Sequence, residues 1–288
     1  MRVHRPAIGI LAATCLTAAC AASRADPPAT EPPRARAEHP TLYAALWVQT
    51  SAEYRATAWQ AYAAAGESLL RALTDPSWTA AVEQEGSDFA DLPPAVVLDV
   101  DETVLDNSPF QARMILDGGT FDPQAWTVWV DEAAAPPVPG AREFLRLADS
   151  LGVAAFYVTN RDEEHEAATR RNLEVAGLPV DPEVDTVLTR GEREGWTSDK
   201  SSRRETIAER YRIVLVIGDD FNDFVAASLP RADRERLVER YRDLWGERWI
   251  VLPNPNYGSW EGALYPPGDR SDDEEARLRL EALEDLRP

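Results

Sequence analysis

Three short runs of branched apolar residues, separated by helical stretches, restrict the fold of this chain more than any other feature. They cover residues 95–99, 153–158 and 212–217, with a weaker fourth run at 185–188. Uninterrupted apolar runs of this length are typical of strands buried on both faces. The helical stretches between them cover residues 141–150, 163–176 and 201–211. Strands that alternate with such helices form βαβ units, so we expect an α/β fold with a parallel sheet flanked by helices.

The regions around this alternating pattern also have helical spacing. From Leu42 to about Leu73, apolar and aromatic residues recur at helical intervals, which predicts one long or two short amphipathic helices packed on the main domain. A further short helix is expected over 78–85, so that an N-terminal helical segment covers about 40–90. Residues 271–286 combine spaced leucines with many charges, which predicts a terminal helix with a solvated face.

The composition narrows the chemistry that such a fold can perform. The 288 residues include 30 basic and 50 acidic side chains, a formal net charge of −20. Nucleic-acid phosphates are bound by clustered lysines and arginines, so we expect no nucleic-acid partner. The two cysteines, Cys15 and Cys20, both lie near the N-terminus, and the three histidines are scattered. These counts disfavour catalysis by cysteine or histidine, and an enzyme of this composition is expected to use carboxylates.

The N-terminus has the features of an export signal. Arginines precede an apolar run that is too short to span a membrane, and small residues then lead to Cys20. The ending LTAAC resembles a bacterial lipobox, whose cysteine is lipidated, although Thr17 stands where leucine is usual; a simple secretory signal cut near Ala22 is the alternative. We expect a signal peptide, a tether and a folded domain, which cover residues 1–19, 20–39 and 40–288. The protein is thus expected in the bacterial cell envelope, periplasmic or at the cell surface, with a lipid anchor as its only membrane contact.

The polar residues that follow the predicted strands are the candidate site residues. In parallel sheets the carboxyl ends of the strands meet at one edge, where ligands bind. The residues expected there are Asp99, Asp101, Thr159, Asn160, Lys200, Asp219 and Asp223. Asp99 and Asp101 are two positions apart, so extended backbone directs both to the same side. Carboxylates this close repel each other unless a cation lies between them, and an oxygen-only ligand set suits Mg²⁺.

Lys200 differs from the other members of this set in its rarity. It is the only lysine among 30 basic residues, all the others being arginines. An ammonium group on a flexible stem is chemically distinct from a planar guanidinium. A single lysine at the start of a helix beside the sheet edge therefore indicates a specific function.

These residues lie in blocks that resemble the four motifs of the haloacid-dehalogenase-like (HAD) phosphatases. VVLDVDETVL at 96–105 resembles motif I, Thr159 motif II, Lys200 motif III and GDDFND at 218–223 motif IV. Further blocks resemble the class C acid phosphatases, the lipoprotein e family of outer-membrane 5′-nucleotidases. They are LDNSPF at 105–110, WTVWVDE at 126–132, PGAREF at 139–144, FYVTNR at 156–161 and LPNPNYGSWEGAL at 252–264. The resemblance implies a HAD-like (Rossmannoid) fold with a small cap insertion at about 106–139.

The same resemblance implies a phosphomonoester substrate and a role for each candidate residue. Asp99 would be the nucleophile that forms an aspartyl-phosphate, and Asp101 the proton donor and later the base. The phosphate-binding residues would be Thr159, Asn160 and Lys200. The ligands of an Mg²⁺ cofactor would be Asp99, Asp101 through its backbone carbonyl, Asp219 and Asp223.

Aromatic residues in these blocks bear on the substrate. The resemblance implies that Trp126 and Tyr257 stack on a nucleobase, which makes a nucleoside 5′-monophosphate the leading substrate. Packing alone is the alternative for each of these two residues. Packing is favoured for Phe110, Trp129 and Trp260.

Several alternatives stay open at the level of the sequence. Arg161 either contributes to the site or caps the following helix, and His165 is expected at the surface. The chain could be a phosphatase without nucleotide preference, a catalytically silent binding lipoprotein, or a glycosyltransferase that binds a nucleotide-sugar through its DxD pair. The intact set of motifs favours a phosphatase. The oligomeric state is left open, a homo-oligomer included.

Overall fold

The computed structural model describes residues 37–227 and 229–283. The predicted signal peptide, Cys20 and nearly all of the predicted tether lie outside the described residues. Within the described part of the chain, no helix has the length and apolar character needed to cross a lipid bilayer.

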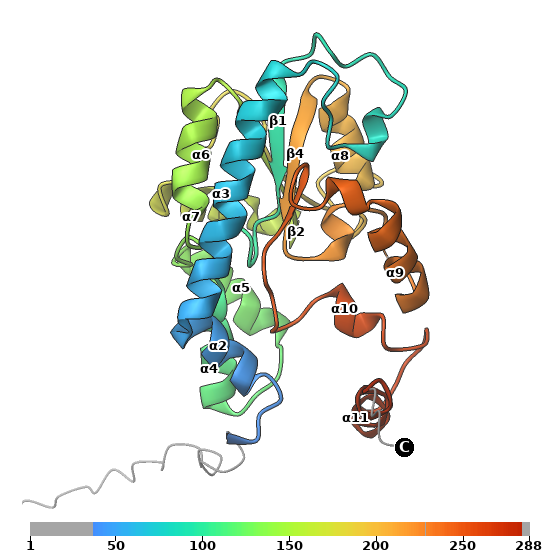
Figure 1. The fold of residues 1–288 in the computed structure, drawn as a ribbon. Coiled ribbons are helices and arrows are strands. Elements are labelled where there is room, and N and C mark those ends of the chain that lie inside the picture. Colours follow the sequence, from blue (N-terminus) through green and yellow to red (C-terminus); the bar gives the residue numbers. More distant parts are fainter. Residues whose placement is uncertain (1–36, 228, 284–288) are drawn as a thin grey trace, which may run out of the picture.

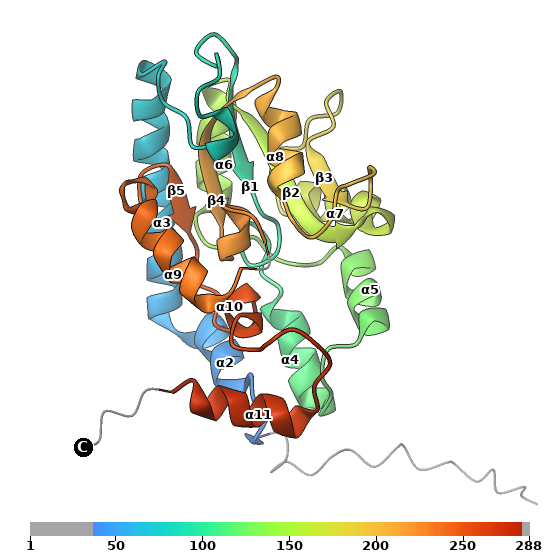
Figure 2. The same cartoon turned by 90° about the vertical axis from the view of Figure 1, so that its right-hand side faces the viewer.

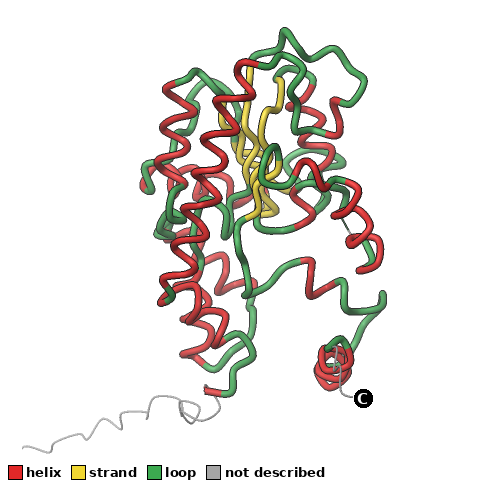
Figure 3. The backbone as a smooth tube through the Cα atoms, viewed as in Figure 1, coloured by secondary structure: helices red, strands yellow, loops and turns green. Residues whose placement is uncertain are grey.

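A five-stranded sheet lies at the centre of the molecule (Figures 1 and 3). Its strands are β1 (Pro94–Leu98), β2 (Ala154–Asp162), β3 (Val187–Arg190), β4 (Arg212–Gly218) and β5 (Trp249–Val251). All neighbours pair in parallel, in the order β3-β2-β1-β4-β5. The predicted α/β fold with a parallel sheet is therefore confirmed. From β1 the chain builds the sheet outward through β2 and β3 on one side, and then through β4 and β5 on the other. Sheets of this type bind ligands beyond the carboxyl ends of the two strands at which the direction changes, here β1 and β4.

Helices cover both faces of this sheet. The α-helices of the described residues are α2 (Leu42–Thr50), α3 (Ala52–Thr74), α4 (Ser108–Asp117), α5 (Pro123–Glu132), α6 (Ala141–Ser150), α7 (Glu166–Val175), α8 (Ser201–Ala208), α9 (Arg231–Arg240), α10 (Ser259–Gly262) and α11 (Asp272–Glu281). Val96 and Leu98 of β1 belong to a core built with α3, α6 and α7. Ala95 and Val97, which alternate with them, belong to a second core that includes Ile207 of α8. Burial on both faces explains why the strands read as continuous apolar runs.

The N-terminal helical stretch consists of two helices that meet at Ser51. This residue has an extended backbone, and its Oγ accepts a hydrogen bond from the N–H of Tyr54 at 3.0 Å, which caps α3. Further along α3, the hydroxyl of Tyr62 donates to the carbonyl of Thr103 at 2.6 Å. The helix thus fixes the loop that follows the central strand.

Helices α4 and α5 lie in an excursion of the chain between β1 and α6. The N–H of Asp106 donates to the carbonyl of Pro136 at 2.8 Å, and the N–H of Val138 donates to the carbonyl of Val104 at 3.0 Å. The chain therefore leaves and returns at adjacent points. Both helices lie beyond the carboxyl ends of the strands, and α11 crosses the same end of the molecule (Figure 2).

Some elements differ from the prediction. Strand β2 continues through the polar residues to Asp162, and the weak fourth strand forms two residues later than predicted. The expected short helix over 78–85 is a single 3-10 turn, Val82–Gln84. Strand β5 was not predicted, because three residues are too few to establish a pattern.

Candidate active site

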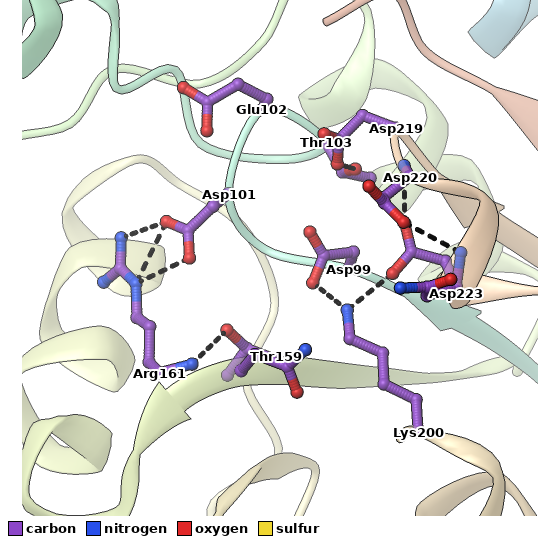
Figure 4. Close-up of polar contacts among 12 residues, drawn as sticks. Asp99, Asp101, Glu102, Thr103, Thr159, Arg161, Lys200, Asp219, Asp220 and Asp223 are labelled. Atoms are coloured by element: carbon purple, nitrogen blue, oxygen red, sulfur yellow. Dashed lines mark hydrogen bonds and ion pairs between the residues drawn. The ribbon is translucent and has the colours of Figure 1, made fainter. Parts of the chain in front are cut away.

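The polar residues that follow the strands meet beyond the carboxyl edge of the sheet (Figure 4). Asp99 directly follows β1, and Asp219 directly follows β4. Thr159 lies in the last part of β2, Lys200 is the residue before α8, and Asp223 ends the 3-10 turn that begins at Phe221. The apolar strand interiors are enclosed by the two cores, so the strand ends are where the sheet can present polar groups. The convergence expected from the sequence is therefore present.

Lys200 forms ion pairs with two aspartates, Asp99 and Asp223. Its Nζ donates to the Oδ1 of Asp223 at 2.7 Å and also to the Oδ1 of Asp99. The lysine side chain is 6% exposed, and its carboxylate partners are similarly buried. Burial alone lowers the pKa of Lys200, but the charges of Asp223 and Asp99 outweigh it and raise this pKa above its ordinary value. The single lysine of the chain is thus a buried cation held between carboxylates.

Asp99, Asp219 and Asp223 form a compact set of oxygen ligands. One carboxylate oxygen from each lies within 4.8 Å of the others. Burial raises the pKa of Asp99 to about 7, with the charges of Asp223 and Asp101 acting in the same direction. Burial and the neighbouring charge of Asp99 raise the pKa of Asp219 well above its usual range. Three buried carboxylates beside one ammonium group leave an excess of negative charge, so this donor set fits a metal cation.

Asp101 points away from this cluster, toward Arg161 (Figure 4). The Nη2 of Arg161 donates to the Oδ1 of Asp101 at 2.7 Å, and its Nε donates to both carboxylate oxygens at 3.1 and 3.2 Å. The Nδ2 of Asn107 donates to the same Oδ1 at 2.8 Å. The structure therefore decides between the two alternatives for Arg161, which lies in the site as the ion-pair partner of Asp101.

Glu102 is a buried residue of the site that sequence reasoning missed. Its φ of +58° lies in the left-handed region, which non-glycine residues adopt rarely and at an energetic cost. Its carboxylate accepts hydrogen bonds from the backbone N–H of Asn107 at 3.0 Å and from the hydroxyl of Tyr257. Burial raises the pKa of Glu102 to about 8, with the charge of Asp101 adding to the effect. These bonds hold the turn after β1 against the segment that carries Tyr257.

The predicted phosphate-binding pair on β2 is held by a buried arginine. The Oγ1 of Thr159 accepts a hydrogen bond from the N–H of Arg161 at 3.1 Å. The Oδ1 of Asn160 accepts from Nη2 of Arg203 at 2.7 Å, and its Nδ2 donates to the carbonyl of Ser198 at 3.1 Å. Arg203 also donates to the carbonyl of Thr159. In this arrangement Asn160 fixes the loop before α8, a structural function that the sequence did not indicate.

A cleft of about 720 Å³ opens onto these groups. The polar residues beyond the strand ends line it, Asp99, Asp101, Arg161, Lys200 and Asp219 among them. Four further segments contribute to its wall: residues 39–41, the α4–α5 region with Phe110, Phe121 and Trp126, residues 256–259 with Tyr257 together with Glu261, and Arg279 of α11. Trp126 and Tyr257 thus both border the cleft, on different segments. The predicted terminal helix, expected as a solvated face, also contributes a side chain to this wall.

The other aromatic and histidine predictions have mixed outcomes. Phe110 and Trp129 are buried, in agreement with packing, whereas Trp260 is 45% exposed and does not belong to the core. The prediction that His165 lies at the surface is wrong, because it is 4% exposed. Helix α5 packs over the turn that contains His165, and the imidazole Nε2 lies 3.2 Å from the Oγ1 of Thr127.

Comparison with protein families gives a match over most of the chain. The sequence profile of the HAD superfamily, subfamily IIIB (acid phosphatase), matches residues 5–260. Acid phosphatase 1 of Solanum lycopersicum is 30% identical over 165 residues, which are 56% of this chain and 57% of that protein. The stem 31 kDa glycoprotein of Glycine max is 28% identical over 170 residues, 56% of this chain and 58% of that protein. The chain therefore spans less than two thirds of these plant relatives.

Solved structures give a broader match. The class C acid phosphatase from Bacillus anthracis superposes with a TM-score of 0.74 and 36% sequence identity, over 86% of this chain and 98% of that one. A crystal structure of the same phosphatase with tungstate bound gives a TM-score of 0.74 and 34% identity over the same shares. The similarity thus extends over nearly the whole of that bacterial protein.

Proposed function

The chain belongs to the HAD superfamily, subfamily IIIB, the acid phosphatases, and from this premise we propose that it hydrolyses phosphomonoesters, with nucleoside 5′-monophosphates preferred. Acid phosphatases are phosphoric monoester hydrolases. The observation that carries the proposal is the buried ion-pair cluster of Lys200 with Asp99 and Asp223, three residues that line the cleft. The tungstate bound to the Bacillus anthracis phosphatase supports it as well, because tungstate is a tetrahedral oxyanion like phosphate.

In the proposed first step, a carboxylate oxygen of Asp99 attacks phosphorus and the bond to the leaving oxygen breaks, which gives an aspartyl-phosphate. A carboxylate and a phosphate dianion repel each other, so the charge around the reacting atoms must be neutralised. Lys200 is placed to do this, since its ammonium group lies against Asp99. The hydroxyl of Thr159 and the ammonium of Lys200 would then hold the phosphoryl oxygens.

Asp101 is the proposed proton carrier. As a carboxylic acid it would protonate the leaving alkoxide, and as a carboxylate it would then take a proton from the water that hydrolyses the aspartyl-phosphate. Its side chain borders the cleft and lies outside the cluster around Lys200. This separation allows Asp99 and Asp101 to have different functions although they are two residues apart.

Mg²⁺ is the proposed cofactor. The residues that would hold it are Asp99, Asp219, Asp223 and the backbone carbonyl of Asp101, an all-oxygen set of the kind that Mg²⁺ prefers. When bound, a divalent cation would neutralise negative charge on the nucleophile and on the phosphoryl group. The raised pKa values of Asp99 and Asp219 agree with this proposal, because burial and the neighbouring carboxylates disfavour their charged forms, which a bound cation would favour.

The preference for nucleotides rests on the aromatic wall of the cleft. Tyr257 borders the cleft with its hydroxyl fixed by Glu102, so its ring has a defined orientation. Phe121 and Trp126 border the cleft as part of the α4–α5 region. Stacking of a base on an aromatic ring is worth about 1–3 kcal/mol and tolerates every base. A nucleoside monophosphate fits a cleft whose wall combines these charged groups with aromatic rings.

We further propose that the protein is exported and that Cys20 carries a lipid anchor. The support is the order of arginines, apolar run and small residues before Cys20. Incorporation of an alkyne-labelled fatty acid into the wild type, but not into Cys20→Ala, would support the anchor. Equal labelling of the two chains would contradict it.

Phosphate release tests the catalytic proposal. The purified protein is incubated with Mg²⁺ and with AMP, other 5′-nucleotides, p-nitrophenyl phosphate or sugar phosphates, and each reaction is repeated in EDTA. We expect the highest kcat/KM on 5′-nucleotides, with all turnover lost in EDTA and in Asp99→Asn. Equal kcat/KM on all substrates would indicate a phosphatase without nucleotide preference. Near-normal rates in Asp99→Asn would exclude Asp99 as the nucleophile.

A further inference from the structure

We propose that Trp126 and Arg161 are positioning residues for the carboxylate of Asp101. On this view Trp126 contributes to the turnover of every substrate with a poor leaving group, whether or not that substrate carries a base. The inference rests on the proposed function of Asp101 as the proton donor.

Each of the three guanidinium nitrogens of Arg161 donates a hydrogen bond. Its Nη2 and Nε donate to the carboxylate of Asp101, and its Nη1 donates to the Oγ1 of Thr169 at 3.1 Å. The side chain is 1% exposed, so water does not compete for these donors. The arginine therefore holds Asp101 through several charge-assisted bonds in a defined orientation.

Trp126 is the aromatic partner of this guanidinium. The Cζ of Arg161 lies 5.5 Å from the centroid of the indole ring, within the range of a cation–π contact. Phe110 contacts the same ring edge to face, with centroids 5.1 Å apart. Trp126 thus lies between the buried aromatic residues of the insertion and the arginine that holds Asp101.

In this arrangement Trp126 restricts the orientation of Arg161, a function that is separate from stacking on a nucleobase. Proton transfer needs the carboxyl oxygen within hydrogen-bonding reach of the leaving oxygen. Without the indole, Arg161 would keep its charge but lose a wall that limits its rotation. The carboxylate of Asp101, whose side chain is 18% exposed, would then be held by Asn107 and by an arginine whose orientation is less restricted.

The dependence on the leaving group separates positioning from stacking. Ribose 5-phosphate has an alkoxide leaving group and no base, whereas p-nitrophenyl phosphate has a leaving group that departs with little protonation. General acid catalysis contributes about 10²–10⁴-fold to rates, and we expect loss of positioning to remove about 10–100-fold. Trp126→Ala and Arg161→Met should therefore lower kcat on ribose 5-phosphate and AMP alike, and change kcat on p-nitrophenyl phosphate less than about 3-fold.

Three further variants complete the experiment. Trp126→Phe keeps an aromatic face for the guanidinium and should retain most of the activity on ribose 5-phosphate. The double variant of Trp126→Ala and Arg161→Met should be no slower than Arg161→Met alone, because residues that act through one contact are not additive. Arg55→Met removes an arginine–tryptophan contact of the same 5.5 Å, to the ring of Trp59 on α3, outside the lining of the cleft, and should leave all rates unchanged. Thermal unfolding of each variant verifies that it is folded.

The inference is overturned if Trp126→Ala raises KM for AMP only and leaves kcat on ribose 5-phosphate unchanged, since that result assigns the indole to the base. Equal losses on ribose 5-phosphate and p-nitrophenyl phosphate would overturn it too, because they indicate a general distortion of the site. A wild-type protein that is inactive on all three phosphates would instead refute the proposed function itself. The two failures are therefore distinguishable.

Discussion

Replacing Lys200 by methionine should destabilise the metal-free protein strongly at pH 8 and much less at pH 5. The lysine Nζ lies 2.7 Å from Asp223 and also binds Asp99, and all three side chains are buried. Methionine has a similar length and no charge, so it leaves these carboxylates without their cation. Removing one partner of a buried ion pair costs about 3–5 kcal/mol, because the remaining charge is uncompensated.

The direction of the pH effect follows from the raised pKa of Asp99. A carboxyl group whose pKa is higher in the folded state stabilises the fold below its unfolded pKa, and this contribution is lost as pH rises through the folded pKa. For Asp99 the folded value is about 7 even with Lys200 present. At pH 5 the carboxyls of the variant can therefore take up protons and avoid most of the cost, whereas at pH 8 they cannot.

Urea unfolding in EDTA, followed by tryptophan fluorescence, measures the difference. Arg71→Met is the matched control, because Arg71 pairs with Glu247 at the same distance of 2.7 Å, with side chains that are 52% and 47% exposed. Exposed pairs contribute about 0–1 kcal/mol. A Lys200→Met variant that costs no more than Arg71→Met at pH 8, or costs more at pH 5 than at pH 8, would refute this reasoning.

Three other outcomes are expected. Burial raises the pKa of Glu102 to about 8, so the metal-free wild type should lose up to about 5 kcal/mol of unfolding free energy between pH 4.5 and pH 8. Glu102→Gln should reduce this dependence of the unfolding free energy on pH, measured by urea titration. An unchanged pH dependence in the variant would contradict the prediction. Asp219→Asn should abolish the stabilisation of the fold by Mg²⁺. For the wild type this stabilisation is about 3 kcal/mol at an Mg²⁺ concentration of 100 times Kd, and it is measured as the difference in Tm between MgCl₂ and EDTA. An equal rise in Tm for the two proteins would exclude Asp219 as a ligand. Gly140→Ala should cost about 2 kcal/mol or more in thermal unfolding, because Gly140 has a φ of +93° and a Cβ there would lie 3.0 Å from Tyr62. The control Gly152→Ala, with a φ of +70° and no atom within 4 Å, should cost about 1 kcal/mol, and equal losses would contradict the steric argument.

The centre of the fold could be predicted because its signals are local. Each of the long strands is a continuous apolar run, and the polar residues at its end are adjacent in the sequence. Strand β5 gave no such signal, since its three residues are recognisable only by their pairing with β4. The positions of the strand ends and the parallel arrangement of the strands were enough to predict the α/β class and the convergence of the aspartates with Lys200.

The parts that could not be predicted depend on contacts between distant segments. His165 lies one turn into a predicted helix and was expected at the surface, yet α5 from earlier in the chain covers it. Arg203 lies in a polar stretch at the start of a helix, a pattern typical of an exposed surface. It is nevertheless buried, and its guanidinium donates to the carbonyl of Thr159 and to the side-chain oxygen of Asn160. The ion pair of Arg161 with Asp101 joins residues 60 positions apart. Pairing at this range has no local signature.

The wall of the cleft has a consequence for where selectivity is encoded in this chain. His39, Pro40 and Thr41 border the cleft from the beginning of the described chain, and Arg279 borders it from near the end. Asp99, the proposed nucleophile, by contrast follows the central strand of the sheet. Substitutions in residues 39–41 or in α11 would therefore alter the wall of the cleft and leave the proposed catalytic residues in place. In such an arrangement the range of accepted substrates can change through segments far from the central strands while the reaction itself stays the same.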